Sequence, residues 1–288
     1  MLDDSHRGDP VDDMSNALPL SPTERRELME IACDTARQAG VLVREGFKLS
    51  NRGGIAHKGA IDLVTETDQR SEALIRELLG QRASIPVMGE EQGLVGELAD
   101  TLWVVDPIDG TTNFVHGLPY FAVSIGVWSG GRAVCGAVYH VMADEMFATD
   151  GDTAWLNEHA LPAAADVPLE QALLVSGFSY DRRTNPDNNF ELWEAFVMKC
   201  RGGRRLGAAA LDLVHVASGR LNGYWEANLK PWDFCAGAAI AAATGCTVTT
   251  YSGAALQLRN STMLCAPPGL HAEMREFIAA HRRYPLYD

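Results

Sequence analysis

Two carboxylates, Asp106 and Asp109, flank a proline at the end of an apolar run, and Gly110 and Thr111 follow at once. The run Leu102 to Val105 is typical of a buried strand. Because the proline cannot continue a sheet ladder, we expect the chain to turn there. Both acids then lie at the end of a strand, beside backbone carbonyls and amides. Hard divalent cations prefer such oxygen clusters, and phosphate prefers free backbone N–H groups. The stretch therefore predicts a magnesium-dependent site for a phosphorylated substrate.

The dipeptide Asp109-Gly110 also has a simpler interpretation. Asp-Gly is a common turn, and an Asp that follows a strand often only caps the next helix. A second acid, Asp106, stands behind the proline in the same stretch and favours a site. The rest of the chain has to decide between the two interpretations.

The composition is that of an ordinary globular protein. The chain has 288 residues, enough for about two domains, and 47% of them are hydrophobic and 22% charged. The net charge of −14 argues against nucleic acid as a partner, because proteins that bind phosphate backbones need basic faces. Six cysteines form no Cys-x-x-Cys pair, which predicts reduced thiols rather than a zinc site or a disulfide framework. No segment resembles a signal peptide or approaches the length of a membrane span, so we expect a cytoplasmic protein with no membrane partner.

The elements that must position the acids mix helices and strands without strict alternation. Residues 1–20 are acidic, polar and aperiodic, which predicts a disordered tail. Helices are expected from Ser21, which forms a capping box with Glu24, to about Gly46, and from about Thr67 to Gly80. The other expected elements are the strands Ile85–Met88, Phe121–Val127, Ala133–His140, Leu173–Ser176 and Gly223–Trp225 and the helices Ala208–Ser218 and Phe234–Thr244. This mixture predicts a layered α/β or α+β architecture, with a change of composition from about residue 150 that separates two halves.

Acids also end strands or open helices in three further segments. These segments are Asp62 to Asp68, Glu90-Glu91 and Trp232-Asp233. Each alone fits a cap or a solvated turn. Together with Trp103 to Phe114 (WVVDPIDGTTNF) and Trp232 to Ala238 (WDFCAGA), their types, order and spacing resemble the inositol monophosphatase family of lithium-sensitive, metal-dependent sugar phosphatases. The resemblance covers roughly residues 22–288.

The resemblance implies a role for each residue that matches the family pattern. The metal ligands would be Glu90, Asp106, Asp109, Asp233 and the Ile108 carbonyl. Gly110 and Thr111 would form the phosphate-binding turn, and Thr111 with Asp62 would orient the attacking water, so that Asp62, Glu90 and Thr111 are the expected catalytic residues. The substrate contacts would be completed by Gly207, Ala208, Ala209, Glu226 and Asp233.

The same resemblance implies the fold, the cofactor and the assembly. We expect the layered αβαβα sandwich of the inositol monophosphatase and fructose-1,6-bisphosphatase type. The site would lie between an N-terminal α+β half (21–150) and a C-terminal α/β half (151–288). Two or three Mg²⁺ ions per active site, inhibition by lithium and a homodimer are also implied. Two Mg²⁺ ions about 4 Å apart can generate hydroxide and stabilise the leaving alkoxide, so we expect direct attack by water without a phosphoenzyme.

Other chemistries find little support in the sequence. The Asp-x-Asp pattern of haloacid dehalogenase-type phosphatases fails, because Pro107 stands two residues before Asp109. There is no Walker-type loop, no Gly-x-Ser-x-Gly and no His-Glu-x-x-His. The eight histidines show no ligand spacing, and we interpret His116 and His215 as surface or satisfied core groups.

The substrate is the least determined property. Thr112 to Pro119 is similar to inositol monophosphatases, which favours an inositol monophosphate as the small phosphorylated polyol or sugar. Fructose 1,6-bisphosphate, histidinol phosphate and adenosine 3′,5′-bisphosphate remain alternatives within the family. A regulatory binding protein that retains a phosphatase site is the alternative from another class.

Overall fold

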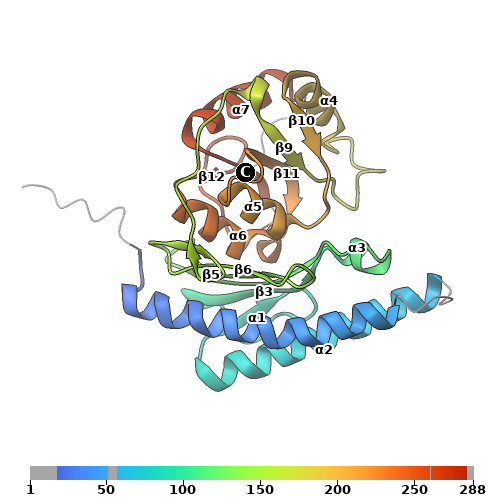
Figure 1. The fold of residues 1–288 in the computed structure, drawn as a ribbon, viewed down its shortest axis with the longest axis vertical. Coiled ribbons are helices and arrows are strands. Elements are labelled where there is room, and N and C mark those ends of the chain that lie inside the picture. Colours follow the sequence, from blue (N-terminus) through green and yellow to red (C-terminus); the bar gives the residue numbers. More distant parts are fainter. Residues whose placement is uncertain (1–17, 51–56, 260, 284–288) are drawn as a thin grey trace, which may run out of the picture.

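A computed structural model describes residues 18–50, 57–259 and 261–283; the side chains of residues 49, 50, 57–65 and 261 lie outside the description. The elements form five layers (Figure 1). Helices α1 and α2 cover one face of an eight-stranded sheet, and α5 and α6 cover its other face. A five-stranded sheet follows, with α4 and α7 on its outer side. The expected αβαβα sandwich is therefore confirmed.

The helices are short except for the first two. They are α1 (Pro22–Ser50), α2 (His57–Arg82), α3 (Thr111–Val115), α4 (Phe190–Lys199), α5 (Ala209–Ala217), α6 (Pro231–Ala243) and α7 (Pro268–His281), with a 3₁₀ turn, η1, at Leu169–Gln171. The strands of the first sheet are β1 (Val87–Gly89), β2 (Gly93–Leu94), β3 (Thr101–Asp109), β4 (Ala122–Ser129), β5 (Arg132–His140), β6 (Glu145–Thr149), β7 (Ala154–Leu156) and β8 (His159–Ala160). Those of the second sheet are β9 (Leu173–Ser176), β10 (Gly202–Arg204), β11 (Gly223–Leu229), β12 (Thr247–Thr249) and β13 (Ser261–Ala266).

The two sheets differ in how their strands run. The first has the order β2-β1-β3-β4-β5-β6-β7-β8 and is antiparallel except where β1 runs parallel to β3. The second has the order β10-β9-β11-β13-β12, and its strands β10, β9 and β11 are parallel. The chain passes from one sheet to the other between Ala160 and Leu173. The division into halves at residue 150 stays a prediction.

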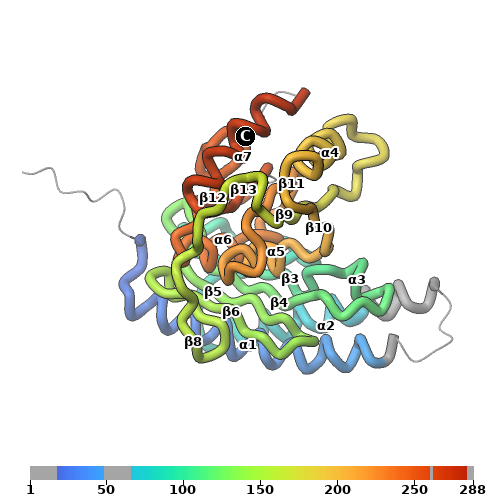
Figure 2. Tube along the Cα trace, turned by 45° about the horizontal axis from the view of Figure 1, so that its top comes forward, coloured from blue at the N-terminus to red at the C-terminus, as the bar shows by residue number. Residues whose placement is uncertain are grey.

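Three apolar clusters hold the layers together. One lies between α1, α2 and the first sheet and includes Ile75, Trp103 and Phe121. A second joins the first sheet to α5, α6 and the second sheet, so α5 and α6 are buried between the sheets, as Figure 2 also shows. A third packs α4 and α7 against the outer face of the second sheet. Helix α6 is apolar on nearly all sides because sheets cover it on both sides.

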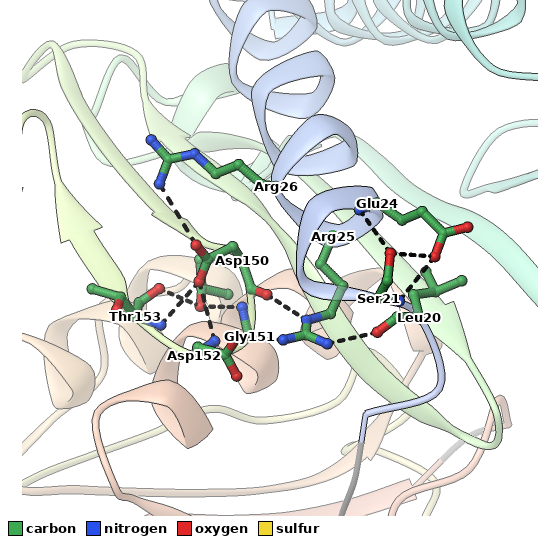
Figure 3. Close-up of polar contacts among 10 residues, drawn as sticks. Leu20, Ser21, Glu24, Arg25, Arg26, Asp150, Gly151, Asp152 and Thr153 are labelled. Atoms are coloured by element: carbon green, nitrogen blue, oxygen red, sulfur yellow. Dashed lines mark hydrogen bonds and ion pairs between the residues drawn. The ribbon is translucent and has the colours of Figure 1, made fainter.

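The start of α1 is anchored to the turn after β6 (Figure 3). Ser21 and Glu24 form the predicted capping box: the Glu24 N–H donates to Ser21 Oγ at 3.2 Å, and the Ser21 N–H donates to the Glu24 carboxylate at 2.9 Å. The buried guanidinium of Arg25 donates to the carbonyls of Leu20 (2.6 Å) and Asp150 (2.7 Å), and it pairs with Asp152. These bonds fix the position at which α1 begins to cross the sheet.

Two local expectations were wrong. Helix α2 begins at His57, well before Thr67, because it lies alongside α1 over its length, and tertiary packing stabilises helical turns that local propensity alone would not. The chain also does not turn at Pro107, since β3 continues to Asp109. The ladder with β4 is interrupted after Asp106 and resumes where Asp109 pairs with Ala122, so the proline sits in a bulge.

Several predictions concern the ends of the chain and its thiols. Residues 1–17 of the predicted disordered tail lie outside the described residues, whereas Leu18 and Leu20 pack against the first apolar cluster. All six cysteines are free thiols, as predicted. Among the described helices, none is both long enough and apolar enough to cross a membrane.

Candidate active site

The bulge in β3 places its two acids, Asp106 and Asp109, on the same side, where both line one cavity. Asp106 is the last residue of the regular ladder and Asp109 the first after it. Between them the Ile108 N–H donates a hydrogen bond of 3.0 Å to Asp106 Oδ1, which closes the bulge around the carboxylate. Both acids are buried, with exposures of 2% and 6%. Pro107 tolerates this position because no ladder hydrogen bond is needed from it.

Gly110 makes the turn that follows. Its φ of +96° lies in the left-handed region, which a side chain disfavours. A Cβ at this position would also lie 3.0 Å from the Tyr120 carbonyl and 3.1 Å from Ala208. Helix α3 starts immediately after the turn, and the Thr111 hydroxyl donates to the Ile108 carbonyl at 3.0 Å. Glycine is therefore required both by the backbone angle and by close packing.

Asp109 connects the first sheet to α5. Its two carboxylate oxygens accept hydrogen bonds from the N–H groups of Ala209 (3.0 Å) and Ala210 (2.8 Å), which open that helix. The positive end of the helix dipole favours the ionised carboxylate there. Asn113 makes a second link, since its side-chain amide donates to the carbonyls of Tyr120 and Leu206, both at 2.8 Å.

The second sheet and α6 contribute the remaining acids. Asp233 stands in the first turn of α6 and accepts the Lys230 N–H at 2.7 Å. Glu226 lies on β11 and accepts the Tyr224 hydroxyl at 2.7 Å. Its carboxylate fills the space beside Gly177, where a Cβ would come within 2.1 Å of Oε2. Both carboxylates are thus held by neighbours from their own segment.

Glu90 follows β1, the strand parallel to β3. Its N–H donates to the Val105 carbonyl at 3.2 Å, which brings it next to the end of β3. The loop after it is held by Glu72, a fully buried carboxylate on α2 that accepts the N–H groups of Glu91 (2.7 Å) and Gln92 (3.1 Å). Arg76 pairs with Glu72 at 2.8 Å, so this buried charge is compensated.

These segments enclose a cavity of about 360 Å³, a size typical of small-molecule sites. Nearly all site residues expected from the sequence line it. They are Glu90, Asp106, Ile108, Asp109, Gly110, Thr111, Gly207, Ala208, Ala209, Glu226 and Asp233. The exception is Asp62, whose side chain lies outside the described residues. The structure thus brings together residues from four separate parts of the chain.

Burial and mutual repulsion make the carboxylates weaker acids than usual. Burial raises the pKa of Asp106 and of Asp109 well above the usual range, and the charges of Glu90 and Asp233 respectively add to the effect. Burial and the charge of Asp233 raise the pKa of Glu90 to about 7. Burial also raises the pKa of Glu226 to about 7 and that of Asp233 to about 6. The cluster therefore holds more negative charge than its surroundings compensate.

The donor set fits metal ions with oxygen ligands. Asp68 on α2 extends the cluster, because burial and the charge of Glu90 raise its pKa to about 8. Its Oδ1 is buried and has no hydrogen-bond partner among the described residues. Converging carboxylates with an unpartnered oxygen suit hard divalent cations, which would compensate the repulsion. The four acids expected as metal ligands, Glu90, Asp106, Asp109 and Asp233, thus lie together in one cavity.

The sequence analysis missed one wall of the cavity. This wall is the segment Gly177 to Asp181, with Arg205 and Asn228 beside it. The segment follows β9 directly, at the carboxyl end of a strand that is parallel to both its neighbours. Ligands often bind at that end of parallel strands, so recognising the parallel arrangement would have pointed to the segment.

Comparison with known proteins gives a consistent result. The model of the inositol monophosphatase family matches residues 24–284. Inositol-1-monophosphatase of Synechocystis sp. is 37% identical over 91% of this chain and 92% of its own. Nus factor SuhB of Escherichia coli (strain K12) is 37% identical over 78% of this chain and 86% of its own. The solved structure of inositol monophosphatase from Anabaena (Nostoc) sp. PCC 7120 has a TM-score of 0.82 and 32% identity, and the match covers 90% of this chain and 98% of that one.

The family model spans nearly the whole described part of the chain, including every segment that lines the cavity. This match, together with the fold and the relatives above, leaves one assignment. The chain belongs to the inositol monophosphatase family of metal-dependent phosphatases, and it is a phosphatase.

Proposed function

We propose that this phosphatase hydrolyses an inositol monophosphate to inositol and phosphate, with two or three Mg²⁺ ions in its active site. The observation that carries the proposal is the cavity itself, which acids of the first sheet, of the loop after β1 and of α6 line together with the Gly110-Thr111 turn and the Glu226 carboxylate of the second sheet. The relative from Synechocystis is named for the same reaction.

The proposed ligands are Glu90, Asp106, Asp109, Asp233 and the Ile108 carbonyl. Their oxygen donors suit Mg²⁺, which would supply Lewis-acid activation of water and screen the charge of the phosphate. The hydrogen bonds from Ile108 to Asp106 and from Ala209 and Ala210 to Asp109 hold each carboxylate in one orientation. Because the ligands are fixed before the substrate arrives, little reorganisation is needed during the reaction.

The Gly110-Thr111 turn is the proposed phosphate site. The turn lies against the acids, and its glycine lets the backbone approach the ligand closely. The Thr111 hydroxyl donates to the Ile108 carbonyl, which leaves its oxygen able to accept a hydrogen bond from the attacking water and so to orient it. Asp62 is proposed to share this task.

The opposite wall is the proposed polyol site. Glu226 presents a carboxylate that can accept hydrogen bonds from hydroxyl groups of the substrate, and Arg205 supplies donors in the same cavity. Gly207 and Ala208 form the floor beside them, while the Ala209 N–H is already used by Asp109. A hydroxyl-rich leaving group fits this polar wall better than an apolar one.

The test is phosphate release, with and without Mg²⁺, from myo-inositol 1-phosphate, fructose 1,6-bisphosphate, histidinol phosphate and adenosine 3′,5′-bisphosphate. We expect Mg²⁺-dependent cleavage with a preference for inositol 1-phosphate. A preference for another of the four would keep the chemistry and change the substrate. Turnover of none of them, by protein that binds Mg²⁺, would favour the regulatory alternative, to which the relative named Nus factor SuhB gives some weight. The cytoplasmic location, the homodimer and lithium inhibition stay predictions.

A further inference from the structure

A second group of possible metal ligands lies outside the acidic cavity. His140 ends β5, Glu145 begins β6, and His215 comes from α5, the helix that packs on this face of the sheet (Figure 1). One ligand atom from each residue lies within 4.8 Å of those of the other two. None of the three lines the acidic cavity. The sequence analysis interpreted His215 as a surface or satisfied core group, and both its ring nitrogens do have partners, Tyr120 and Arg220.

The hydrogen bonds show which nitrogen of each imidazole carries no proton. The Nε2 of His140 lies 3.2 Å from the Pro119 carbonyl, which can only accept, so this nitrogen carries the proton and Nδ1 is a bare acceptor. The Nε2 of His215 lies 3.2 Å from a guanidinium nitrogen of Arg220, which can only donate, so here Nε2 is the bare acceptor. The Nδ1 of His140 lies 4.0 Å from Glu145 Oε2, and the Nε2 of His215 shares the Arg220 guanidinium with the same carboxylate.

The Nδ1 atom of His140 has no hydrogen-bond partner among the described residues. The residue is 8% exposed, and its Nδ1 is buried. This nitrogen lies 4.0 Å from Glu145 Oε2. Burial lowers the pKa of His140, and burial with the charge of Arg220 lowers the pKa of His215 to about 4. Both rings are therefore neutral at neutral pH, as metal ligation requires.

In each ring, the nitrogen that would not bind the metal has a hydrogen-bond partner of the kind found at metal sites. Histidines that bind metals usually donate their other N–H to a carbonyl or, directly or through a neighbour, to a carboxylate. His140 meets the Pro119 carbonyl in this way. The Nδ1 of His215 lies 3.2 Å from the Tyr120 hydroxyl, which in turn donates to Asp212 at 3.0 Å. These hydrogen bonds thus fix the orientation of each ring, with the unprotonated nitrogen on the side opposite the bond.

A cation already occupies the space between the three side chains. The guanidinium of Arg220 makes two hydrogen bonds of 2.6 Å to Glu145 and reaches Nε2 of His215. Its side chain is 40% exposed, so it can swing into solvent without burying its charge. The hydrogen bonds from Arg220 lower the pKa of Glu145, so the carboxylate is ionised in the structure, and a metal ion that displaces the guanidinium would take over the compensation of its charge.

From this geometry we infer that His140, Glu145 and His215 form a second metal site, which takes a divalent transition metal of the Zn²⁺ type in place of the Arg220 guanidinium. Two imidazoles and a carboxylate favour such ions, whereas Mg²⁺ prefers oxygen ligands alone. Ligand atoms around a tetrahedral Zn²⁺ are about 3.3 Å apart, given bonds of about 2.0–2.1 Å. The 4.0 Å between His140 Nδ1 and Glu145 Oε2 then needs to contract by less than about 1 Å, and a pair of ligand atoms at the 4.8 Å limit of the group by about 1.5 Å. The fourth position would be open to water.

The test measures Zn²⁺ uptake by equilibrium dialysis with saturating Mg²⁺, which occupies the acidic cavity. We expect one Zn²⁺ per chain. His215→Gln and Glu145→Gln should each weaken it by about 100-fold or more, since even the loss of an outer partner costs about 10–100-fold. Arg220→Met should tighten it by about tenfold or more, because the competing charged hydrogen bonds are removed. His271→Gln is the matched control: His271 is also buried and its pKa is also lowered to about 4, but it bonds to Thr249 elsewhere in the fold.

Two results would overturn the inference. One is the absence of Zn²⁺ uptake beyond the Mg²⁺ sites; the other is uptake that His215→Gln and Glu145→Gln leave unchanged, which would place the ion in the acidic cavity. A parallel titration in the Asp106→Asn/Asp233→Asn background separates the two sites, because the inferred site should persist there. Near-ultraviolet circular dichroism shows whether each variant is folded, and the Arg220→Met result, a gain of affinity, does not depend on damage to the fold.

Discussion

The backbone N–H of Ala210 donates a hydrogen bond of 2.8 Å to a carboxylate oxygen of Asp109. Asp109 ends β3 of the first sheet, and Ala210 lies in the first turn of α5, between the sheets. The bond therefore joins a proposed metal ligand on the first sheet to α5, the helix that directly follows the proposed polyol contacts Gly207 and Ala208. The site is positioned by this junction between layers rather than by any one segment.

Asp106→Asn should abolish phosphatase activity, by at least about a thousandfold, because several kcal/mol of metal-based charge stabilisation are lost. The same change should raise the melting temperature in EDTA at neutral pH, since it removes one charge from a buried, mutually repelling cluster. Phosphate release and thermal unfolding give the two readouts. Activity close to that of the unchanged protein would contradict the proposed ligand role.

Asp109→Asn should lose activity to the same extent but gain less thermal stability in EDTA. The carboxylate accepts two backbone N–H groups, whereas an amide would turn its NH₂ toward one of them. An unsatisfied buried donor costs about 1–3 kcal/mol, which offsets the relief of charge repulsion. Comparison of the two variants in EDTA isolates this cost. A larger gain for Asp109→Asn than for Asp106→Asn would argue against the junction.

The stability of the metal-free protein should fall as the pH rises from about 4.5 to about 7. In this window Glu226 and Glu90, whose pKa values rise from 4.5 to about 7, keep their protons in the folded state and lose them in the unfolded state. The folded state then binds more protons, so the free energy of unfolding decreases with pH. Asp233, raised from 3.8 to about 6, adds to the slope at its lower end.

Mg²⁺ should oppose this trend, because the ionised carboxylates bind it and its affinity increases over the same pH range. Melting curves in EDTA and in Mg²⁺ from pH 4.5 to 7.5 would show the two slopes diverging. Glu226→Gln should flatten the slope in EDTA. Parallel slopes in the two buffers would mean that the acids do not hold the metal.

Gly110→Ala should destabilise the fold by about 1–3 kcal/mol and lower activity, because its φ of +96° disfavours a side chain and a Cβ would meet the Tyr120 carbonyl at 3.0 Å. Gly96→Ala is the matched control, since Gly96 has a φ of +100° but open space around the added Cβ. Denaturant unfolding and phosphate release compare the two. Equal activity per folded molecule in both variants would show that the turn is not part of the site.

Asn113→Leu should destabilise the protein and reduce its activity per folded molecule. It leaves the partly buried carbonyls of Tyr120 and Leu206 without the Asn113 donor and frees the loop before α5 from α3. A fully buried group left in this way would cost about 1–3 kcal/mol, and these two cost less because water reaches them. In the control Asn222→Leu, the lost bond is that to the Leu173 N–H in the second sheet, away from the cavity. That control should lose stability but keep its specific activity. A similar loss of activity in both would point to a general effect on folding.

Much of the candidate site was predictable because its residues lie in short contiguous segments of the chain. The Asp106 to Thr111 stretch, the Glu90-Glu91 pair and the Trp232-Asp233 pair each combine a strand end or helix start with an acid. The hairpin of β4 and β5 and the capping box of α1 also follow from local patterns. Periodicity and capping depend on neighbours in the chain, so the sequence displays them directly.

The rest depends on contacts between distant segments. The early start of α2 and the continuation of β3 through Pro107 come from packing and from a bulge, which no local pattern shows. The cavity wall from Gly177 to Asp181 is apparent only when β9 is known to run parallel to its neighbours. Likewise His140 and His215 have no ligand spacing along the chain and meet only across the contact between α5 and the first sheet.

The sequence by itself thus predicted the family, the layered fold and the acids proposed as metal ligands, because the motifs that carry the resemblance depend on residue type and short-range order. The tertiary structure decided which backbone groups orient those acids, how far burial and repulsion raise their pKa values, and which histidines come together beside Arg220. Orientation, desolvation and charge coupling depend on which groups are close together in space. For segments far apart in the chain, this proximity is set only when the layers pack.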